Sequence, residues 1–464
     1  MHEDPEISVS VETVARLLLG NASSRGFAVS LCDRLRVKAK ADPPPSVAGV
    51  AVSFSGESRS CAVRPRVISP ERSSAFWCFE LAGTLIGNGS ASPQGGSRKV
   101  RPMSQTTLWP QLTQLPLVID SYSLERLDPT HPGGFDRFTT HIRLQGGGTD
   151  GLGEDICLPD DQVALHKAGA TLPLAGQWTL GDFCEHLATL DQWPEEPQWQ
   201  QMRFYRNWTY ESAALDLALR QAGKTLGEFL GKEPQPVRFV NSLGLGDPPI
   251  VDPKDRKPPS FEPLQKRIDH YPELRYKLDA EIGWTPELTA QVAKTGAVDQ
   301  IDFKGLYGFE VEDVPALTAF YERILEAFPD ALIEDPHDLP EITELLQPHV
   351  DRVSYDAPIH SVEDIESTPI RAKTVNIKPS RAGSLKSLFE LYAYCEANGI
   401  AMYGGGMGEL GVGRGQVQLL ASLFHGDSPN DVAPGGYNAS DPPEGLPSSP
   451  LPPPAEPTGF RWAK

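Results

Sequence analysis

Two lysines and three carboxylates recur at regular intervals in the second half of the chain, each near the end of a short apolar run. They are Lys277, Asp302, Glu334, Asp356 and Lys378, separated by 25, 32, 22 and 22 residues. Converging carboxylates repel one another, and a hard divalent cation relieves this because it binds oxygen ligands. An ammonium beside such an ion is driven towards its neutral form and can accept a proton. The three carboxylates are therefore predicted to bind Mg²⁺, with Mn²⁺ as the alternative ion, and the two lysines to act as acid and base.

These intervals are typical of a chain in which short strands alternate with helices. From residue 237 onward, strands are predicted at 238–245, 274–280, 299–305, 331–335, 352–358, 373–379, 401–406 and, more weakly, 431–434. Such alternation predicts parallel pairing with right-handed crossovers. Eight strands predict a TIM-type barrel, in which the C-terminal strand ends share one mouth. An open doubly wound sheet is the alternative.

The chain is expected to divide into four parts. Residues 1–110 are predicted to be a disordered extension or one that is not native, with translation starting at Met103. The reason is that sequence patterns typical of a folded domain begin abruptly near residue 115. An α+β domain is predicted over 111–236, with a meander followed by helices. The barrel occupies 237–438. The proline-rich tail, 439–464, is predicted to be extended, with Phe460 and Trp462 attaching it to the body.

Composition narrows the possible partners. The net charge of −20 argues against binding to nucleic acid or anionic membranes. No apolar run approaches the ~18 residues that a membrane span needs. The six cysteines form no CxxC pair, which argues against a zinc module or a disulfide scaffold and suits the cytoplasm. We expect a cytoplasmic homo-oligomer that acts on a small-molecule carboxylate.

Other residues near the predicted strand ends are weaker candidates. Asn376 shares a face with Lys378 and is predicted to line the pocket. Glu409, after the seventh strand, either contacts substrate or is a solvated loop acid. Lys304 faces the same side as Asp302 and either pairs with a carboxylate or reaches the mouth. Asp335 points the opposite way from Glu334 on an extended strand and is interpreted as structural.

Several motifs in this order resemble the enolase superfamily, in particular its muconate cycloisomerase-like branch, the mandelate racemase–muconate lactonizing enzyme group. The resemblance covers residues 115–438 and rests on "DGLGED", "SAALDLALRQAGKTLGEFLG", "RYK", "IDFKG", "LIEDP", "SYDAP", "VNIKPSRAGSL" and "GGGMGELGVGR". It implies a (β/α)7β barrel with an α+β capping domain formed mainly by the N-terminal part. It also implies the same metal ligands and acid/base lysines as the spacing does.

The sequence departs from that family pattern at identifiable positions. Arg275 stands where the branch has the first lysine of Lys-x-Lys; on an alternating strand it faces the same side as Lys277 and is predicted to hold a substrate carboxylate. "LDAEIGW" also resembles the family's third strand, which would make Asp279 the first metal ligand in place of Asp302. Asp302 is preferred because the other register leaves no earlier strand for a lysine. No His-x-Asp pair occurs on the late strands.

The resulting hypothesis is a Mg²⁺-dependent enzyme that abstracts a proton α to a carboxylate and stabilises an enolate. Racemisation or epimerisation, elimination of water and cycloisomerisation are all consistent with the sequence. A barrel that has lost catalysis and serves as a binding or scaffold protein is the alternative from another class. A sugar-acid dehydratase is a third.

Overall fold

The computed structural model describes residues 108–129, 137–247, 256–308, 311–453 and 458–462, together with the backbone of four strands nearer the N-terminus. Those four strands pair in the antiparallel order β1-β4-β3-β2 within a separate unit, Met1–Val100. They are β1 (Lys38–Ala39), β2 (Val50–Ser53), β3 (Ser60–Val67) and β4 (Ala75–Ala82). The rest of the predicted disordered or non-native extension up to residue 107 lies outside the described residues.

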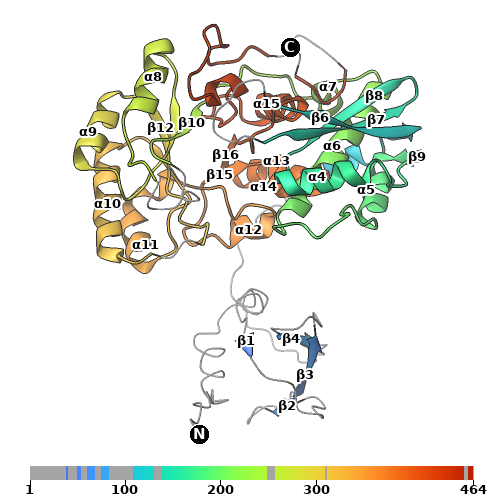
Figure 1. Cartoon of the computed structure of the whole chain (residues 1–464), viewed down its shortest axis with the longest axis horizontal. Helices are drawn as coiled ribbons and strands as arrows, with labels where there is room; N and C mark the ends of the chain where they lie inside the picture. Colours follow the sequence, from blue (N-terminus) through green and yellow to red (C-terminus); the bar gives the residue numbers. More distant parts are fainter. Residues whose placement is uncertain are drawn as a thin grey trace, which may run out of the picture. The chain divides into compact units, whose positions relative to one another are not determined.

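The second unit, Arg101–Lys464, begins with an α+β domain, as predicted from the sequence. Its antiparallel sheets have the orders β6-β7-β8 and β5-β9. The strands are β5 (Pro116–Ile119), β6 (Ser121–Leu127), β7 (Thr139–Gly146), β8 (Thr149–Asp155) and β9 (Gly176–Thr179). The helices are α3 (Trp109–Leu112), α4 (Pro159–Ala168), α5 (Leu180–Ala188), α6 (Met202–Gln221) and α7 (Leu226–Leu230). Figure 1 shows α6 beside β8 in this domain.

The two glycines of "DGLGED" allow helix α6 to lie directly on strand β8. A Cβ atom at Gly151 would lie 2.2 Å from the carbonyl oxygen of Ala213, and one at Gly153 would lie 2.0 Å from that of Thr209. No side chain fits in that space, so the helix and strand approach closely only with glycine at both positions. This contact fixes the end of the hairpin, where Glu154 is located.

A seven-stranded parallel sheet follows, in the order β10-β11-β12-β13-β14-β15-β16. Its strands are β10 (Asn241–Gly244), β11 (Tyr276–Asp279), β12 (Val298–Asp302), β13 (Leu332–Glu334), β14 (Val353–Tyr355), β15 (Thr374–Ile377) and β16 (Ala401–Gly404). The helices between and after them are α8 (Glu262–His270), α9 (Pro286–Lys294), α10 (Val314–Ala327), α11 (Pro340–Leu346), α12 (Val362–Glu366), α13 (Pro379–Ala382), α14 (Leu385–Asn398) and α15 (Val412–Phe424). Two 3₁₀ helices, η1 (Gln347–Arg352) and η2 (Gly435–Asn438), complete the order.

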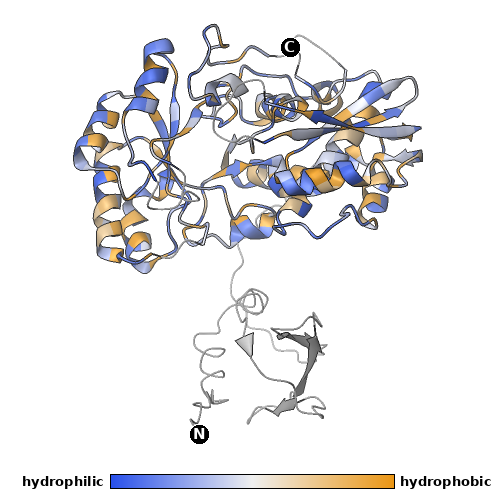
Figure 2. Ribbon diagram, in the orientation of Figure 1, coloured by the Kyte–Doolittle hydropathy of each residue, from blue (hydrophilic) through white to orange (hydrophobic). Residues whose placement is uncertain are grey.

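The alternating strands and helices confirm the predicted mixed α/β architecture and its parallel sheet. The eighth strand expected at 431–434 is absent from the described elements. Two isolated parallel bridges stand in its place, Phe239 with Asn430 and Gly405 with Asp431. Complete (β/α)7β closure therefore stays a prediction. Figure 2 shows hydrophobic residues on the strands and on the helices beside them, as burial of one helix face requires.

Side-chain caps begin three of the helices. The side chains of Thr285, Asp313 and Ser384 accept hydrogen bonds from the backbone N–H groups three residues later, at the starts of α9, α10 and α14. Gly231 ends α7 with a positive φ of 66°, which glycine adopts without steric cost. Among the described residues, no helix is long and apolar enough to cross a membrane.

The C-terminal tail is attached to both domains. Leu451 pairs with Val237 just before the parallel sheet, and both side chains are buried. Phe460 is fully buried, its ring lies edge-on to Trp208 at 6.1 Å, and its N–H donates to Asp216 at 2.8 Å. Trp462 is partly buried against the same core. The expectation that Phe460 and Trp462 hold the tail is therefore confirmed.

Phe460→Ala is expected to lower the free energy of unfolding by about 3–5 kcal/mol, because it removes a fully buried aromatic ring and leaves a cavity. Urea denaturation followed by circular dichroism measures this. Trp199→Ala is the control; Trp199 is 58% exposed, so its replacement should change the free energy by less than about 0.5 kcal/mol. Equal effects of the two substitutions would contradict a structural role for the tail.

Candidate active site

The register of the parallel sheet brings the carboxylates of adjacent strands to one level. Asp279 on β11 lies opposite Asp302 on β12, and Asp302 lies opposite Glu334 on β13. Asp356 and Lys378 follow directly after β14 and β15. Because the strands are parallel, all of these groups emerge at the C-terminal edge of the sheet. Glu334, Asp302 and Asp356 are buried almost completely.

Lys277 lies on β11 with its ammonium among these carboxylates. Its Nζ donates a short hydrogen bond to Glu334 and lies 3.3 Å from Oδ2 of Asp302. Burial by itself lowers the pKa of Lys277, but the charges of Glu334 and Asp302 outweigh it and hold the pKa well above its usual value. Lys277 is thus a charged partner of these two acids.

Asp356 and Lys378 form a second buried ion pair on the other side of the cluster. Nζ of Lys378 lies 2.8 Å from Oδ2 of Asp356, and the Arg381 guanidinium lies 3.3 Å from the same oxygen. Burial opposes ionisation of Asp356, but the two cations hold the pKa of its carboxyl well below the usual range. Its second oxygen, Oδ1, is buried with no hydrogen-bond partner.

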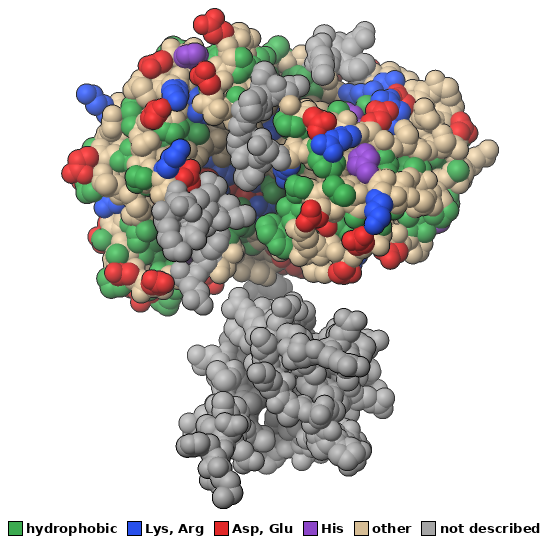
Figure 3. Space-filling model, in the orientation of Figure 1, with side chains coloured by type: hydrophobic (Ala, Val, Ile, Leu, Met, Phe, Trp, Pro, Cys, Tyr) green, Lys and Arg blue, Asp and Glu red, His purple; other side chains and the backbone are tan. Residues whose placement is uncertain are grey.

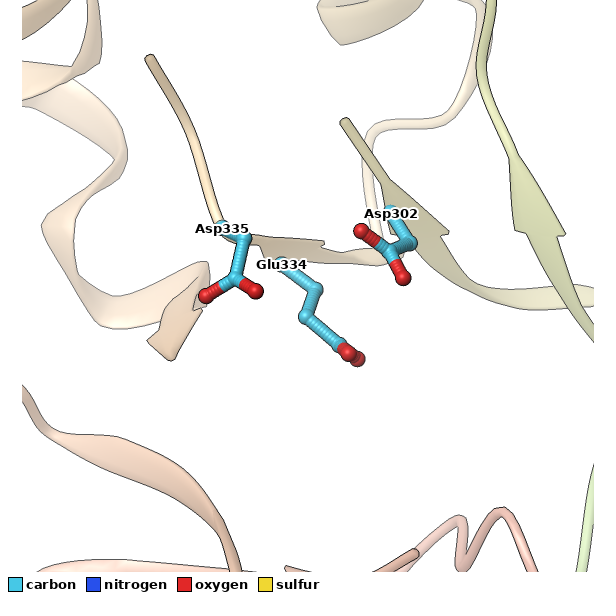
Figure 4. A group of neighbouring side chains, drawn as sticks. All are labelled: Asp302, Glu334 and Asp335. Atoms are coloured by element: carbon cyan, nitrogen blue, oxygen red, sulfur yellow. The ribbon is translucent and has the colours of Figure 1, made fainter. Parts of the chain in front are cut away.

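Asp335 also joins the cluster, which strand alternation did not predict. Ligand oxygens of Asp302, Glu334 and Asp335 lie within 4.8 Å of one another, and Figure 4 shows the three side chains directed to one space. The φ of Asp335 is +46°, which interrupts the extended backbone and turns its side chain towards that of Glu334. Its carboxylate also accepts the N–H groups of Asp356 and Ala357, each at 2.8 Å, so it positions the segment that follows β14.

The donor set fits a divalent cation. Three buried carboxylates whose oxygens lie within 4.8 Å of one another offer hard ligands of the kind that Mg²⁺ prefers. Asp356 follows the next strand of the sheet, and its Oδ1, which has no hydrogen-bond partner, is a further candidate ligand. Burial raises the pKa of Glu334 to about 8, because a carboxylate that is removed from water is costly to ionise. Figure 3 shows this face of the molecule hollowed, with Lys and Arg side chains inside the hollow.

Two models of one protein family match adjoining parts of this chain. Residues 110–229 match the N-terminal domain, and residues 233–439 the C-terminal domain, of a family described as a domain of unknown function, DUF8230. The two matches adjoin and together cover well over half of the chain. The chain belongs to the DUF8230 family.

Curated relatives of this DUF8230 protein are enzymes. An o-succinylbenzoate synthase of Bacillus subtilis is 27% identical over 48% of this chain and 57% of its own length. An N-succinylamino acid racemase of Amycolatopsis sp is 29% identical over 50% of this chain and 59% of its own length. The chain therefore spans somewhat more than half the length of the curated relatives it matches.

Solved structures show the fold. An enolase superfamily member from Listeria innocua has a TM-score of 0.52 at 20% identity, covering 69% of this chain and 86% of its own. A dipeptide epimerase from Methylococcus capsulatus, solved with a Mg ion, has a TM-score of 0.51 at 16% identity, covering 69% and 91%. These structures confirm, for the fold, the resemblance to the enolase superfamily that was inferred from the strand motifs.

The remaining sequence candidates have different outcomes in this DUF8230 protein. Asn376 is buried beside Lys378, and neither of its amide atoms has a hydrogen-bond partner. Glu409 is buried too, 3.2 Å from Arg414. Arg275 is not brought to the cluster; it lies before β11, at the opposite end from Asp279, and its guanidinium donates to Asp299 and Gly296. We therefore leave Arg275 out of the proposed site, because it points away from the mouth.

Sequence reasoning missed Tyr403. Its hydroxyl donates to Oε2 of Glu334 at 2.6 Å and lies 3.1 Å from the hydroxyl of Ser354. Tyr403 orients the carboxylate of Glu334 from the opposite side to Lys277. The available signal was its place in "AMYGGG", where strand alternation puts the tyrosine and the glycine two residues later on one face. That glycine, Gly405, leaves room for Lys378, because a Cβ there would lie 2.5 Å from Cε of the lysine.

Glu154 of the α+β domain binds the start of helix α15. It accepts N–H groups of Leu410, Gly411 and Gly413 at 2.5, 2.9 and 2.8 Å, and the Thr139 hydroxyl at 2.8 Å. Gly411, the N-cap residue, offers no capping side chain of its own. A carboxylate from another domain therefore satisfies one free donor of this helix and two just before it, and interacts favourably with the helix dipole.

Glu154→Ala is expected to speed amide exchange at residues 410–413 about tenfold or more, because it removes the acceptor of three backbone N–H groups. Hydrogen–deuterium exchange with mass spectrometry measures this against the strands β12 to β14, which should be unaffected. Glu125→Ala, at a 42% exposed position on β6, is the matched control. Unchanged protection at 410–413 would show that the loop is held by other contacts.

Proposed function

We propose that this protein is a Mg²⁺-dependent enzyme that abstracts the proton α to the carboxylate of a small molecule. The observation that carries the proposal is the order of groups along the sheet: Lys277 on β11 and Lys378 after β15 flank the acids of β12, β13 and β14. Two bases on either side of one anionic cluster can reach opposite faces of a bound carbon acid. The curated relatives, a synthase and a racemase, support this class of reaction.

Each residue has a distinct role in the proposal. Asp302, Glu334 and Asp356 would hold the ion, which supplies positive charge against the developing enolate. One lysine, as a neutral amine, takes the α-proton onto Nζ, and the bonding electrons remain on the substrate as the enolate; the positive charge of the ion would favour that neutral form. Return of a proton from the other lysine completes racemisation or epimerisation. Arg381 and Tyr403 hold Asp356 and Glu334 in place throughout.

Proton exchange in D₂O tests this proposal whatever the final product. Candidate N-acylamino acids, dipeptides and acid sugars are incubated with protein and MgCl₂, and loss of the α-proton signal is followed by NMR. Exchange in one class, dependent on Mg²⁺, is the expected result. No exchange with any class would favour the scaffold alternative, and dehydration of an acid sugar would favour the dehydratase. The cytoplasmic location and the homo-oligomeric state remain predictions.

A further inference from the structure

Lys304 contributes a third ammonium to the cluster, from the loop that follows β12. Its Nζ lies 2.9 Å from Oδ2 of Asp302 and 2.9 Å from Oδ1 of Asp279. Its own N–H donates to Oδ1 of Asp302, also at 2.9 Å. Both oxygens of Asp302 are therefore bound by one residue. Since Asp302 is also a proposed metal ligand, the ammonium and the ion require the same carboxylate.

The backbone at Lys304 is held in an unfavourable conformation. Its φ is +49°, and Lys304 and Asp335 are the non-glycine residues with positive φ in the part of the chain that the structure describes. Lysine has no short polar side chain to stabilise this region, which costs roughly 1–2 kcal/mol for an ordinary L-residue. Such strain persists only where surrounding contacts hold it. Here the contacts are the two bonds from Lys304 to Asp302.

Four acids of the described cluster are paired with side-chain cations. Asp279, Asp302, Glu334 and Asp356 are each in an ion pair with one or more of four cations, which are Lys277, Lys304, Lys378 and Arg381. Lys277 and Lys304 both contact Asp302, while Asp279 is bound by Lys304. Asp335, the fifth acid, accepts backbone N–H groups instead. The four paired acids can remain buried because each has a counter-ion.

We propose that Lys304 is an internal counter-ion that competes with the divalent ion for Asp302, so that it weakens metal binding and lets the barrel fold without metal. The inference rests on the proposed metal site. Two effects act in the same direction. Without the ion, the ammonium stabilises the ionised Asp302; with the ion, two positive charges lie close together and repel. Asp279 keeps the displaced ammonium nearby, beside the Tyr307 ring, whose centre is 5.5 Å from Nζ.

Lys304→Met tests this, since methionine keeps most of the length of the side chain without its charge. Isothermal titration calorimetry of the full chain with MgCl₂, after removal of metal by a chelator, gives the affinity. We expect Mg²⁺ to bind Lys304→Met about tenfold more tightly than wild type. The rise in melting temperature on addition of Mg²⁺ should also be larger in the variant, because tighter binding to the folded state stabilises it more.

Two further variants make the outcome decisive. Lys304→Gly removes the same charge and also accepts the positive φ, so it should bind Mg²⁺ more tightly even where the methionine variant folds poorly. Lys373→Met removes an exposed lysine paired with Asp351 and should leave the affinity unchanged. Equal or weaker binding by both Lys304 variants would overturn the competition. Absence of Mg²⁺ binding in wild type and variants alike would overturn the metal site and the inference with it.

Discussion

Glu334→Gln is expected to reduce Mg²⁺ affinity at least about a hundredfold, to beyond the range of calorimetry, while the protein remains folded. Glu334 is a fully buried member of the cluster and lies on the central strand of the sheet, and Lys277 and Tyr403 hold its two oxygens. Glutamine keeps the shape but loses the negative charge and one hard oxygen donor, so a divalent ion loses one of its strongest ligands. Titration with MgCl₂ measures the loss directly.

Stability should respond differently from metal affinity in this variant. The carbonyl oxygen of glutamine can still accept one of the two hydrogen bonds, and the volume of the side chain is unchanged. Circular dichroism is therefore expected to report a folded protein. Glu341→Gln, at an exposed position in α11, is the matched control and should bind Mg²⁺ as wild type does. Wild-type affinity in Glu334→Gln would refute the assignment of Glu334 as a ligand.

Lys378→Ala is expected to reduce α-proton exchange about 10²–10⁴-fold, the usual contribution of a positioned acid or base. The side chain is buried, and its Nζ is bound to Asp356 at 2.8 Å, directly after β15. Alanine removes the group that gives or takes the proton on that side of the substrate. Exchange in D₂O, followed by NMR with the substrate class identified above, measures the change.

Mg²⁺ binding separates loss of the base from loss of the site. Arg381 still neutralises Asp356 in Lys378→Ala, so the metal should bind with similar affinity. Lys386→Ala, at an exposed position on α14, is the matched control and should retain full exchange. Retained exchange in Lys378→Ala would remove this lysine from the mechanism. The two predictions together distinguish an ion-binding residue from an acid/base residue.

Sequence reasoning was sufficient for the parts of this protein that depend on local patterns. Strand-length apolar runs alternating with amphipathic segments predicted the parallel sheet, because each short strand must be buried between helices. Capping residues such as Thr285 and Ser384 satisfy donors only a few residues away, so their roles can be read locally. Lys277, Glu334 and Lys378 were predicted at one edge of the sheet because parallel strands put their C-terminal ends there.

Backbone conformation limited the prediction of individual side chains. Strand alternation placed Asp335 on the opposite side from Glu334, but a φ of +46° brings its carboxylate into the cluster. Arg275 shares the alternation of Lys277, yet it lies at the other end of β11, where Asp299 binds it. The two-residue period of a strand predicts which face of the sheet a side chain lies on, but not at which end of the strand it lies.

What the sequence determined by itself is the order of chemistry-bearing groups along successive strands, since that order is fixed once the strands pair in sequence. Only the tertiary structure decided which cations bind the same carboxylate. Asp279 and Asp302 are both strand-end acids in the sequence. Register places them opposite each other, and Lys304 then bridges them while Asp302 also groups with Glu334. The physical reason is that Coulomb interactions and hydrogen bonds depend on separations of a few ångströms, which only the packed strands define.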